Sequence, residues 1–302
     1  MYFSFGTESA VETLVALSKP YAPDRKIGSA RELKAAYLRF LEHYQPQVPA
    51  PVGGTPIFAT DADLVEHLAG FFRVKSWLND KSQGRMIEGQ FSDVLDRTRR
   101  LERGFSELSL VAPEFVEVFE IAINYVFCAS STLAGGGTTS SALGVIWAAH
   151  RNAWSKTDIF EFFVHELTHN MVFLDECRFR HYPDYASLSM PENFVQSAIL
   201  SIPRPLDKVV HSLMVATEVL LFREQVSGHP VAPALHPKTD ILLAKATRCL
   251  TSLDSLKNYA ALLTPRGRLL VERAKSVVAM LSAKHTVNEY DDANFRSVPL
   301  EI

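Results

Sequence analysis

The sequence predicts a mainly α-helical protein with a small β-sheet beside a metal-binding helix, an α+β fold. Two observations support this prediction. Apolar residues recur at helical spacing through the first hundred residues, and again from Asp158 to about His285. Between these stretches, short segments are rich in β-branched and aromatic residues or in glycine, as short buried strands and their connecting loops are. We therefore expect a small sheet formed by the middle of the chain, next to the metal-binding helix.

Helices are predicted over 29–44, 61–72 and 91–108, where apolar residues follow the helical period. Ser29 precedes the first of these stretches and is expected to be its N-cap, because its hydroxyl can accept a hydrogen bond from the first turn. The proline- and glycine-rich segment 45–60 separates the first two helices and is expected to be a loop.

In the middle of the chain, residues 116–129 have the composition of a buried strand, although a helix is also possible. Residues 133–141 are rich in glycine, serine and threonine and are expected to form a loop, and 142–149 a short strand. That strand could offer an edge to which a peptide pairs, or it could be a core strand with Trp147 packed inside.

The chain of 302 residues is long enough for one large domain or two modest ones. We expect an N-terminal helical region over 1–110, which covers the site or binds substrate. A metal-binding catalytic domain is expected over 111–285. The polar, proline-containing tail 286–302 is expected to be loosely held.

Composition excludes several classes of partner. Hydrophobic residues make up 47%, charged residues 22%, and the formal net charge is -3, so neither nucleic acid nor a membrane surface is an expected partner. No apolar stretch is long enough to span a membrane, and the first residues lack the pattern of a signal peptide. Three widely spaced cysteines are expected to be reduced thiols in a cytoplasmic protein. The oligomeric state stays open.

The strongest local signal is His165-Glu166-Leu167-Thr168-His169. Side chains four residues apart lie on one face of a helix, one turn apart, so two imidazoles can chelate one metal ion. Asp158, with Glu161 three residues later, is expected to cap the start of this helix. The alternative is a buried helix with two histidines that are satisfied within the core.

A third ligand must complete such a site, and His211 is favoured. Pro205 suits the first turn of a helix over 206–226, in which His211 should face the core. Asp207, one turn earlier, could accept a hydrogen bond from the second ring nitrogen of His211. Arg204 is about 10 Å before His211 along the axis and could hold the far carboxylate of a short dicarboxylic acid. Glu192 is the alternative third ligand, as in a zinc peptidase.

Three segments together resemble the HExxH-type 2-oxoglutarate-dependent peptide β-hydroxylases: Ser-Ala-Leu-Gly-Val-Ile-Trp at 141–147, Glu-Phe-Phe-Val-His-Glu-Leu-Thr-His-Asn at 161–170, and Arg-Pro-Leu-Asp-Lys-Val-Val-His at 204–211. The resemblance covers about residues 130–225, roughly a third of the chain. It departs from the family at Leu200, where members often carry an arginine, whereas Ser197 still fits.

The resemblance implies Fe(II) held by His165, His169 and His211, with 2-oxoglutarate bound through Arg204 and Ser197. The substrate would be a peptide or amino acid whose side chain is hydroxylated at its β-carbon. The alternative is a zinc metallopeptidase in which Glu166 is the general base that activates a water molecule. In an oxygenase Glu166 would instead orient a ligand or water. The other histidines lack ligand spacing and are expected at the surface or in packing.

Overall fold

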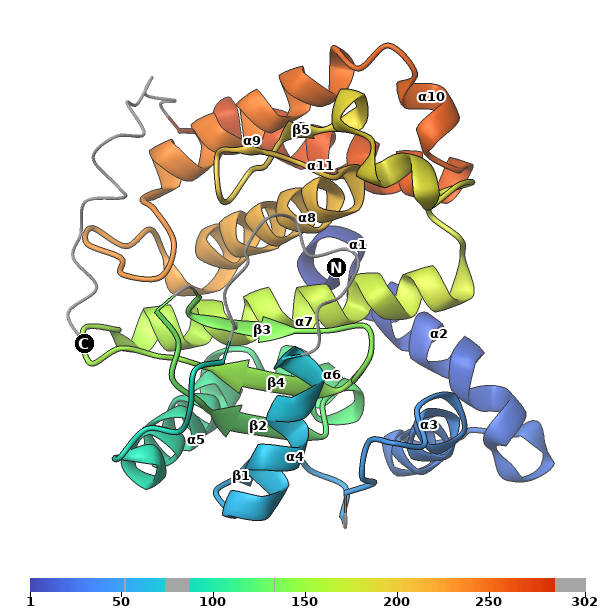
Figure 1. The fold of residues 1–302 in the computed structure, drawn as a ribbon, viewed down its shortest axis with the longest axis vertical. Coiled ribbons are helices and arrows are strands. Elements are labelled where there is room, and N and C mark those ends of the chain that lie inside the picture. Colours follow the sequence, from blue (N-terminus) through green and yellow to red (C-terminus); the bar gives the residue numbers. More distant parts are fainter. Residues whose placement is uncertain (52, 74–86, 133, 286–302) are drawn as a thin grey trace. The chain divides into compact units, whose positions relative to one another are not determined.

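The computed structural model describes residues 1–51, 53–73, 87–132 and 134–285 (Figure 1). The described residues up to Arg178 form one compact unit, and those from Phe179 onward form a second. This division falls inside the segment 111–285 that the sequence predicts as one domain, and the predicted domain boundaries remain predictions. The tail 286–302 lies outside the described residues.

The predicted fold class is confirmed: helices dominate and the strands are short. The helices of the first unit are α1 (Tyr2–Phe5), α2 (Thr7–Ser18), α3 (Ala30–Tyr44), α4 (Ala62–Arg73), α5 (Val94–Val111), α6 (Pro113–Ala122) and α7 (Lys156–Arg178). Its strands are β1 (Ile57–Ala59), β2 (Tyr125–Cys128), β3 (Gly136–Thr138) and β4 (Val145–Ala148).

Three predicted helices are confirmed as α3, α4 and α5, and their starts follow from local capping. The Ser29 hydroxyl accepts a hydrogen bond from the backbone N–H of Glu32 at 3.3 Å, as predicted. Asp61 caps α4 in the same way, because its Oδ1 accepts from the backbone N–H of Leu64 at 2.9 Å.

The strand predicted over 116–129 is only partly correct. Residues 113–122 form helix α6, and the strand is limited to β2. Pro113 at the first helical position fixes a helical φ and needs no N–H donor there, which favours the helix start. An apolar run alone cannot distinguish a buried helix from a buried strand.

The four strands form one sheet in the order β1-β2-β4-β3. β1 and β4 pair with β2 in parallel, and β3 pairs with β4 antiparallel. β4 therefore has a partner on both sides and is fully buried. The hypothesis that this strand offers a free edge to a peptide is wrong, and the core-strand alternative, with Trp147 inside, is confirmed.

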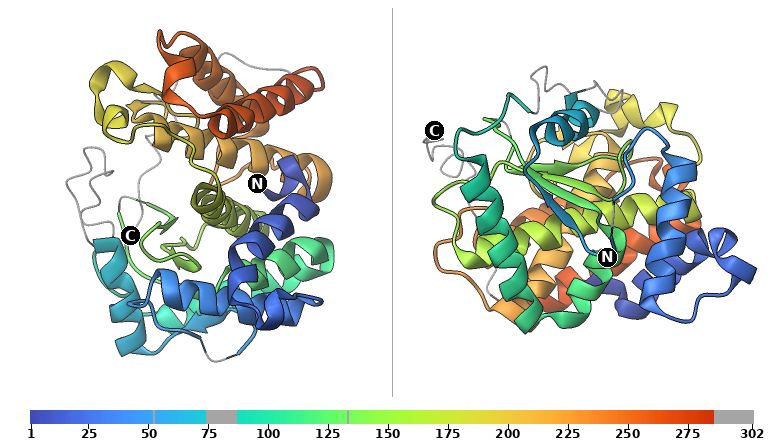
Figure 2. Two further views of the ribbon diagram at one scale, coloured as in Figure 1. Left: turned by 90° about the vertical axis from the view of Figure 1, so that its right-hand side faces the viewer. Right: turned by 90° about the horizontal axis from the view of Figure 1, so that it is seen from below.

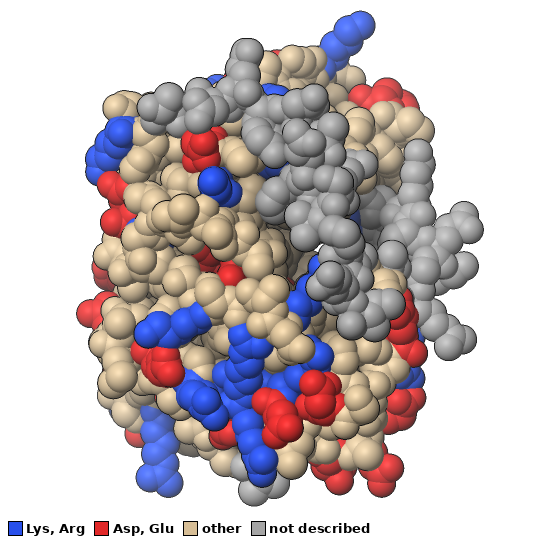
Figure 3. Space-filling model, turned by 90° about the vertical axis from the view of Figure 1, so that its left-hand side faces the viewer, with Lys and Arg blue, Asp and Glu red and all other residues tan. Residues whose placement is uncertain are grey.

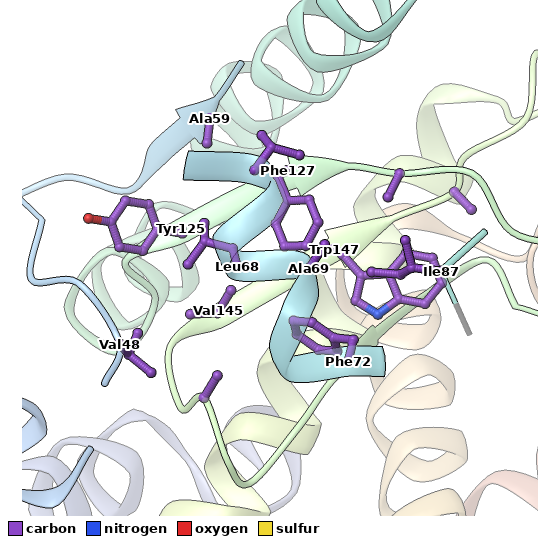
Figure 4. Packing of buried hydrophobic residues seen from close by; sticks show 14 residues of the cluster. Val48, Ala59, Leu68, Ala69, Phe72, Ile87, Tyr125, Phe127, Val145 and Trp147 are labelled. Atoms are coloured by element: carbon purple, nitrogen blue, oxygen red, sulfur yellow. The ribbon is translucent and has the colours of Figure 1, made fainter. Parts of the chain in front are cut away.

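Helices cover both faces of this sheet (Figures 1 and 2). On one face, alternate strand residues pack against α4 (Figure 4): Tyr125, Phe127, Val145 and Trp147 on the strands, and Leu68, Ala69 and Phe72 on the helix. On the opposite face, the Phe58 ring lies 5.8 Å from the ring of Phe105 in α5 and 6.5 Å from that of Phe163 in α7. The sheet is thus the platform on which α7 rests.

Lys34 of α3 is a buried cation that caps α6. Its Nζ donates to the carbonyl oxygens of Glu120, Ile121 and Ile123 at 2.7 to 3.1 Å, and to Oδ1 of Asn124 at 2.8 Å. The last carbonyls of a helix have no partner within the helix and carry partial negative charge, so a cation stabilises them.

Replacing Lys34 with methionine is expected to lower the free energy of unfolding by about 2 to 4 kcal/mol, because it leaves several buried acceptors without a donor. Urea unfolding of both proteins measures the difference. Lys19→Met, at an exposed position, is the matched control. A Lys34→Met protein as stable as this control would show that the cap adds no net stability.

The second unit is built around α8 (Leu206–Phe222), which packs against α9 (Thr239–Asp254) and α11 (Pro265–Ser282). A two-stranded ribbon, β5 (Val195–Gln196) with β6 (Pro203–Arg204), precedes α8. The helix predicted over 206–226 is confirmed, with Pro205 as its N-cap, but its last turn, Arg223–Ser227, is a π-helix.

Within the described ranges, each helix is too short or too polar to cross a bilayer. On the face of the molecule shown in Figure 3, basic and acidic side chains lie intermixed. That pattern agrees with the small net charge of -3 and gives this face no field of a single sign.

Candidate metal centre

Helix α7 carries the HExxH motif and begins at a reciprocal cap. The Ser155 hydroxyl accepts from the backbone N–H of Asp158, and Oδ2 of Asp158 accepts from the Ser155 backbone N–H at 2.8 Å and from its hydroxyl at 2.7 Å. The predicted cap, Asp158 with Glu161, is therefore placed one turn too late: Ser155 is the N-cap, and Asp158 is the last residue of the capping box.

The two motif histidines lie on a partly accessible stripe of an otherwise buried helix. Between Asp158 and Asp175, the side chains of α7 are buried except for those at positions 165, 169 and 173. These positions are four residues apart, so they line one face of the helix. The rest of α7 between these bounds is therefore buried, and both imidazoles lie on the one face that stays partly accessible.

The Nε2 atoms of His165 and His169 lie 3.2 Å apart, and the ring centroids 4.9 Å apart. Two nitrogens bound to one ion at about 2.0 to 2.1 Å, in tetrahedral or cis-octahedral positions, are about 2.8 to 3.4 Å from each other. The observed separation therefore fits two ligands of one cation. An N–H···N hydrogen bond between neutral rings would have a similar length, so the distance permits a metal and does not require one.

Glu166 directly follows His165 in α7, and its buried side chain contacts β3. Its Oε2 accepts a hydrogen bond of 2.6 Å from the hydroxyl of Thr138 in β3. Burial raises the pKa of Glu166 to about 8, although the Thr138 hydrogen bond lowers it. Its other oxygen, Oε1, lies 3.9 Å from Nε2 of His165. The carboxyl group is therefore close to the atom that would bind a metal, with one oxygen fixed by Thr138.

Glycines allow β3 to lie directly on α7 near Glu166. A Cβ atom added to Gly136 would lie 2.5 Å from a ring carbon of Phe162 and 2.7 Å from the Trp147 carbonyl oxygen. Just before β4, the backbone N–H of Gly144 donates a hydrogen bond of 2.8 Å to Oδ1 of Asn170 in α7. The segment predicted as loop, 133–141, therefore contains a strand that supplies the partner of Glu166, and sequence reasoning missed Thr138.

His211 lies on α8 in the second unit and is buried, as predicted. Burial holds the pKa of His211 well below its usual range, and the charges of Lys208, His181 and Arg204 lower it further. A neutral imidazole is the form that binds metals. The three basic groups also make the surroundings of His211 electropositive. The sequence assigned His181 to the surface or to packing and gave no sign that it acts on the pKa of His211.

The surroundings of Asp207 and Ser197 are described, and the roles predicted for them from the sequence remain predictions. Among the described residues, Oδ1 of Asp207 has no hydrogen-bond partner, and Oδ2 lies 3.7 Å from Nζ of Lys208. The Ser197 hydroxyl donates to Ser212 at 3.1 Å and accepts from the backbone N–H groups of residues 199 and 200. Its hydrogen-bonding capacity is used within the protein.

The candidate third ligands belong to the second unit, whereas His165, Glu166 and His169 belong to the first. Glu192 is exposed and lies in the single 3-10 turn Pro191–Asn193. His211 is buried on a long helix with basic groups around it. Each unit is described by itself, and the convergence of three imidazoles on one ion remains a prediction.

Comparison of this chain with known protein families found no match, and neither did comparison with curated proteins.

Proposed function

We propose that the protein is a non-heme Fe(II)- and 2-oxoglutarate-dependent oxygenase that hydroxylates an unactivated carbon of a peptide or amino-acid side chain, at the β-carbon. His165, His169 and His211 would hold the iron, with Arg204 binding the co-substrate. The observation on which the proposal depends most is the 3.2 Å separation of the two Nε2 atoms on α7. We place the protein in the cytoplasm, because its three cysteines are free thiols.

The donor set suits this metal. Three neutral imidazoles leave open positions on an octahedral Fe(II), as non-heme oxygenases require, and add no negative charge. Bound Fe(II), together with 2-oxoglutarate, would supply the activation of oxygen needed to oxidise a C–H bond. The chain's own residues bind and orient the reactants and keep water from them. The buried, neutral state of His211 fits the role of ligand.

The basic surroundings of His211 fit a dianionic co-substrate. Burial is the main cause of the lowered pKa of His211 and of the raised pKa of Asp207, and the positive charges of Lys208 and Arg204 act on the pKa of both groups. A guanidinium group can bind a carboxylate through two parallel hydrogen bonds, which fixes its orientation as well as its position. Arg204 is held in β6 by its pairing with Val195, so its backbone is fixed before any ligand binds.

A zinc metallopeptidase is the second candidate, and one observation favours it. The Glu166 carboxyl lies 3.9 Å from Nε2 of His165, where a general base for a metal-bound water would be needed. However, the hydrogen bond to Thr138 occupies one of its oxygens. The exposed position of Glu192 also gives this candidate a weaker third ligand than His211.

Anaerobic reconstitution with Fe(II), followed by oxygen and 2-oxoglutarate, tests the proposal. Formation of succinate that depends on both iron and the protein is the expected result, and a peptide substrate should increase it. Zinc-dependent cleavage of a peptide library, with no succinate, would favour the peptidase and overturn the proposal.

Replacing Arg204 with glutamine is expected to raise the 2-oxoglutarate concentration for half-maximal succinate formation by about tenfold or more. The reason is the loss of a charge-assisted hydrogen bond worth about 1.5 to 3 kcal/mol. Fe(II) binding should change little. Arg248→Gln, at an exposed position of α9, is the control. Equal 2-oxoglutarate dependence in the two variants would remove Arg204 from the binding site.

A further inference from the structure

A second group of metal-ligating side chains lies in the second unit, away from the α8 residues discussed above. Glu224 is in the π-helical turn that ends α8, His229 follows Gly228, and His285 lies three residues after Ser282, the end of α11. The two histidines are far apart in the sequence, so spacing could not reveal them. One carboxylate oxygen and one nitrogen of each imidazole all lie within 4.8 Å of one another.

A single oxygen of Glu224 faces both imidazoles. Its Oε2 is 2.9 Å from Nε2 of His285 and 3.4 Å from Nε2 of His229. The ring centroids of the two histidines are 4.4 Å apart, with the ring planes inclined at 64°. In a tetrahedral zinc site with arms of about 2.0 to 2.1 Å, neighbouring ligand atoms are about 3.3 to 3.4 Å apart. The two distances from Oε2 are thus close to the spacing that one small divalent ion imposes, and all three donor atoms lie within 4.8 Å of one another.

Two of the remaining polar atoms, one on Glu224 and one on His229, have partners outside the cluster. Nζ of Lys284 donates to Oε1 of Glu224 at 2.7 Å, which turns Oε2 toward the histidines. Nδ1 of His229 lies 3.0 Å from Oγ1 of Thr239, which also accepts from Arg223. With Nδ1 as donor to Thr239, Nε2 of His229 keeps its lone pair. Such outer partners orient the ligands of metal sites.

We propose that Glu224, His229 and His285 form a binding site for a divalent transition-metal ion of the zinc class, separate from the HExxH motif. Nitrogen and carboxylate donors suit Zn²⁺. The three side chains are partly exposed, so a water molecule can take the fourth position. The ion would join the end of α8, the segment before α9 and the end of α11, and would stabilise the second unit without taking part in the proposed oxidation.

Zn²⁺ titration of the full chain in the His165→Ala/His169→Ala background tests this site, because the background removes the α7 pair. Isothermal titration is expected to show one equivalent bound. Adding His285→Ala should weaken that binding at least about 100-fold, since losing even an outer partner costs about 10- to 100-fold. Adding His67→Ala instead should leave it unchanged. Zn²⁺ should raise the melting temperature of the background protein and of the His67→Ala control, but not that of the His285→Ala variant.

Glu224→Gln keeps the shape of the side chain and provides a second test if His285→Ala does not fold. It should weaken Zn²⁺ binding while circular dichroism stays unchanged. A folded background protein that binds no Zn²⁺ would overturn the proposal, because the cluster would then be an ion pair of Glu224 with Lys284 and His285 only. Unchanged affinity in Glu224→Gln would overturn it as well. Either result leaves the proposed oxygenase unaffected, since succinate formation is measured in the protein with α7 intact.

Discussion

Replacing His169 with alanine is expected to abolish stoichiometric binding of Fe(II) at the HExxH site and to lower turnover by at least about 100-fold. Substitution of a residue that only orients a ligand already costs about 10- to 100-fold in metal affinity or activity, and the loss of a ligand costs more. The 3.2 Å separation of the two Nε2 atoms fits a pair of histidines that chelate one ion, so we expect either histidine alone to bind the ion far more weakly than the pair. The same loss is expected for His165→Ala.

The measurement is a competition titration with a chromophoric chelator, in a protein whose Glu224 cluster carries the Glu224→Gln change so that a second site does not contribute. Phe173→Leu is the matched control, because position 173 continues the same accessible stripe of α7 and offers no ligand. If His169→Ala binds Fe(II) as tightly as the control, the two histidines form only an N–H···N hydrogen bond.

The same titration identifies the third ligand. His211→Ala is expected to weaken Fe(II) binding strongly, whereas Glu192→Ala should leave it unchanged. The reverse result would assign the exposed carboxylate of Glu192 to the metal and favour hydrolysis over oxidation.

Features set by neighbouring residues in the chain could be predicted from the sequence. The Ser29 cap, helix α4 and the two-histidine face of α7 depend on spacings of three or four residues, which the sequence displays directly. The burial of His211 likewise follows from its position in a long apolar helix. These are local properties, and the folded structure preserves them.

Features set by tertiary pairing could not be predicted. The 133–141 segment has a loop-like composition, yet three of its residues pair with β4 and one of them, Thr138, binds Glu166. The strand β4 appeared free because its partners lie elsewhere in the chain. His229 and His285 meet at Glu224 only because α8 and α11 pack together. The composition of a segment indicates its propensity for helix, strand or loop, whereas these contacts depend on which segments pack together in the folded chain.

Replacing Glu166 with glutamine separates the two candidate chemistries. An oxygenase needs no base at this position, so turnover is expected to stay within about tenfold of the wild type. A peptidase would lose its general base, whose contribution is about 100- to 10,000-fold. Glutamine retains an oxygen that can accept the Thr138 hydrogen bond, which keeps the local structure. Succinate formation and peptide cleavage are measured on the same preparation. Retained succinate formation supports the oxygenase, and loss of peptide cleavage supports the peptidase.

The same substitution is expected to change how stability depends on pH in the metal-free protein. Burial raises the pKa of Glu166 from 4.5 to about 8, so the folded state holds this proton more tightly than the unfolded chain does. The resulting stabilisation is complete below pH 4.5 and is lost as the pH rises to about 8. Its ceiling is about 5 kcal/mol, at about 1.4 kcal/mol per pKa unit.

Glutamine does not ionise, so Glu166→Gln should equal the wild type near pH 4 and exceed it in stability by several kcal/mol at pH 8.5, in urea unfolding with a chelator present. Glu176→Gln, at a partly exposed position of the same helix, is the matched control. A wild type that keeps its full stability at pH 8.5 would mean that Glu166 ionises without cost. Adding the metal should reduce the difference between Glu166→Gln and wild type, because a cation bound beside the carboxylate favours its ionised form.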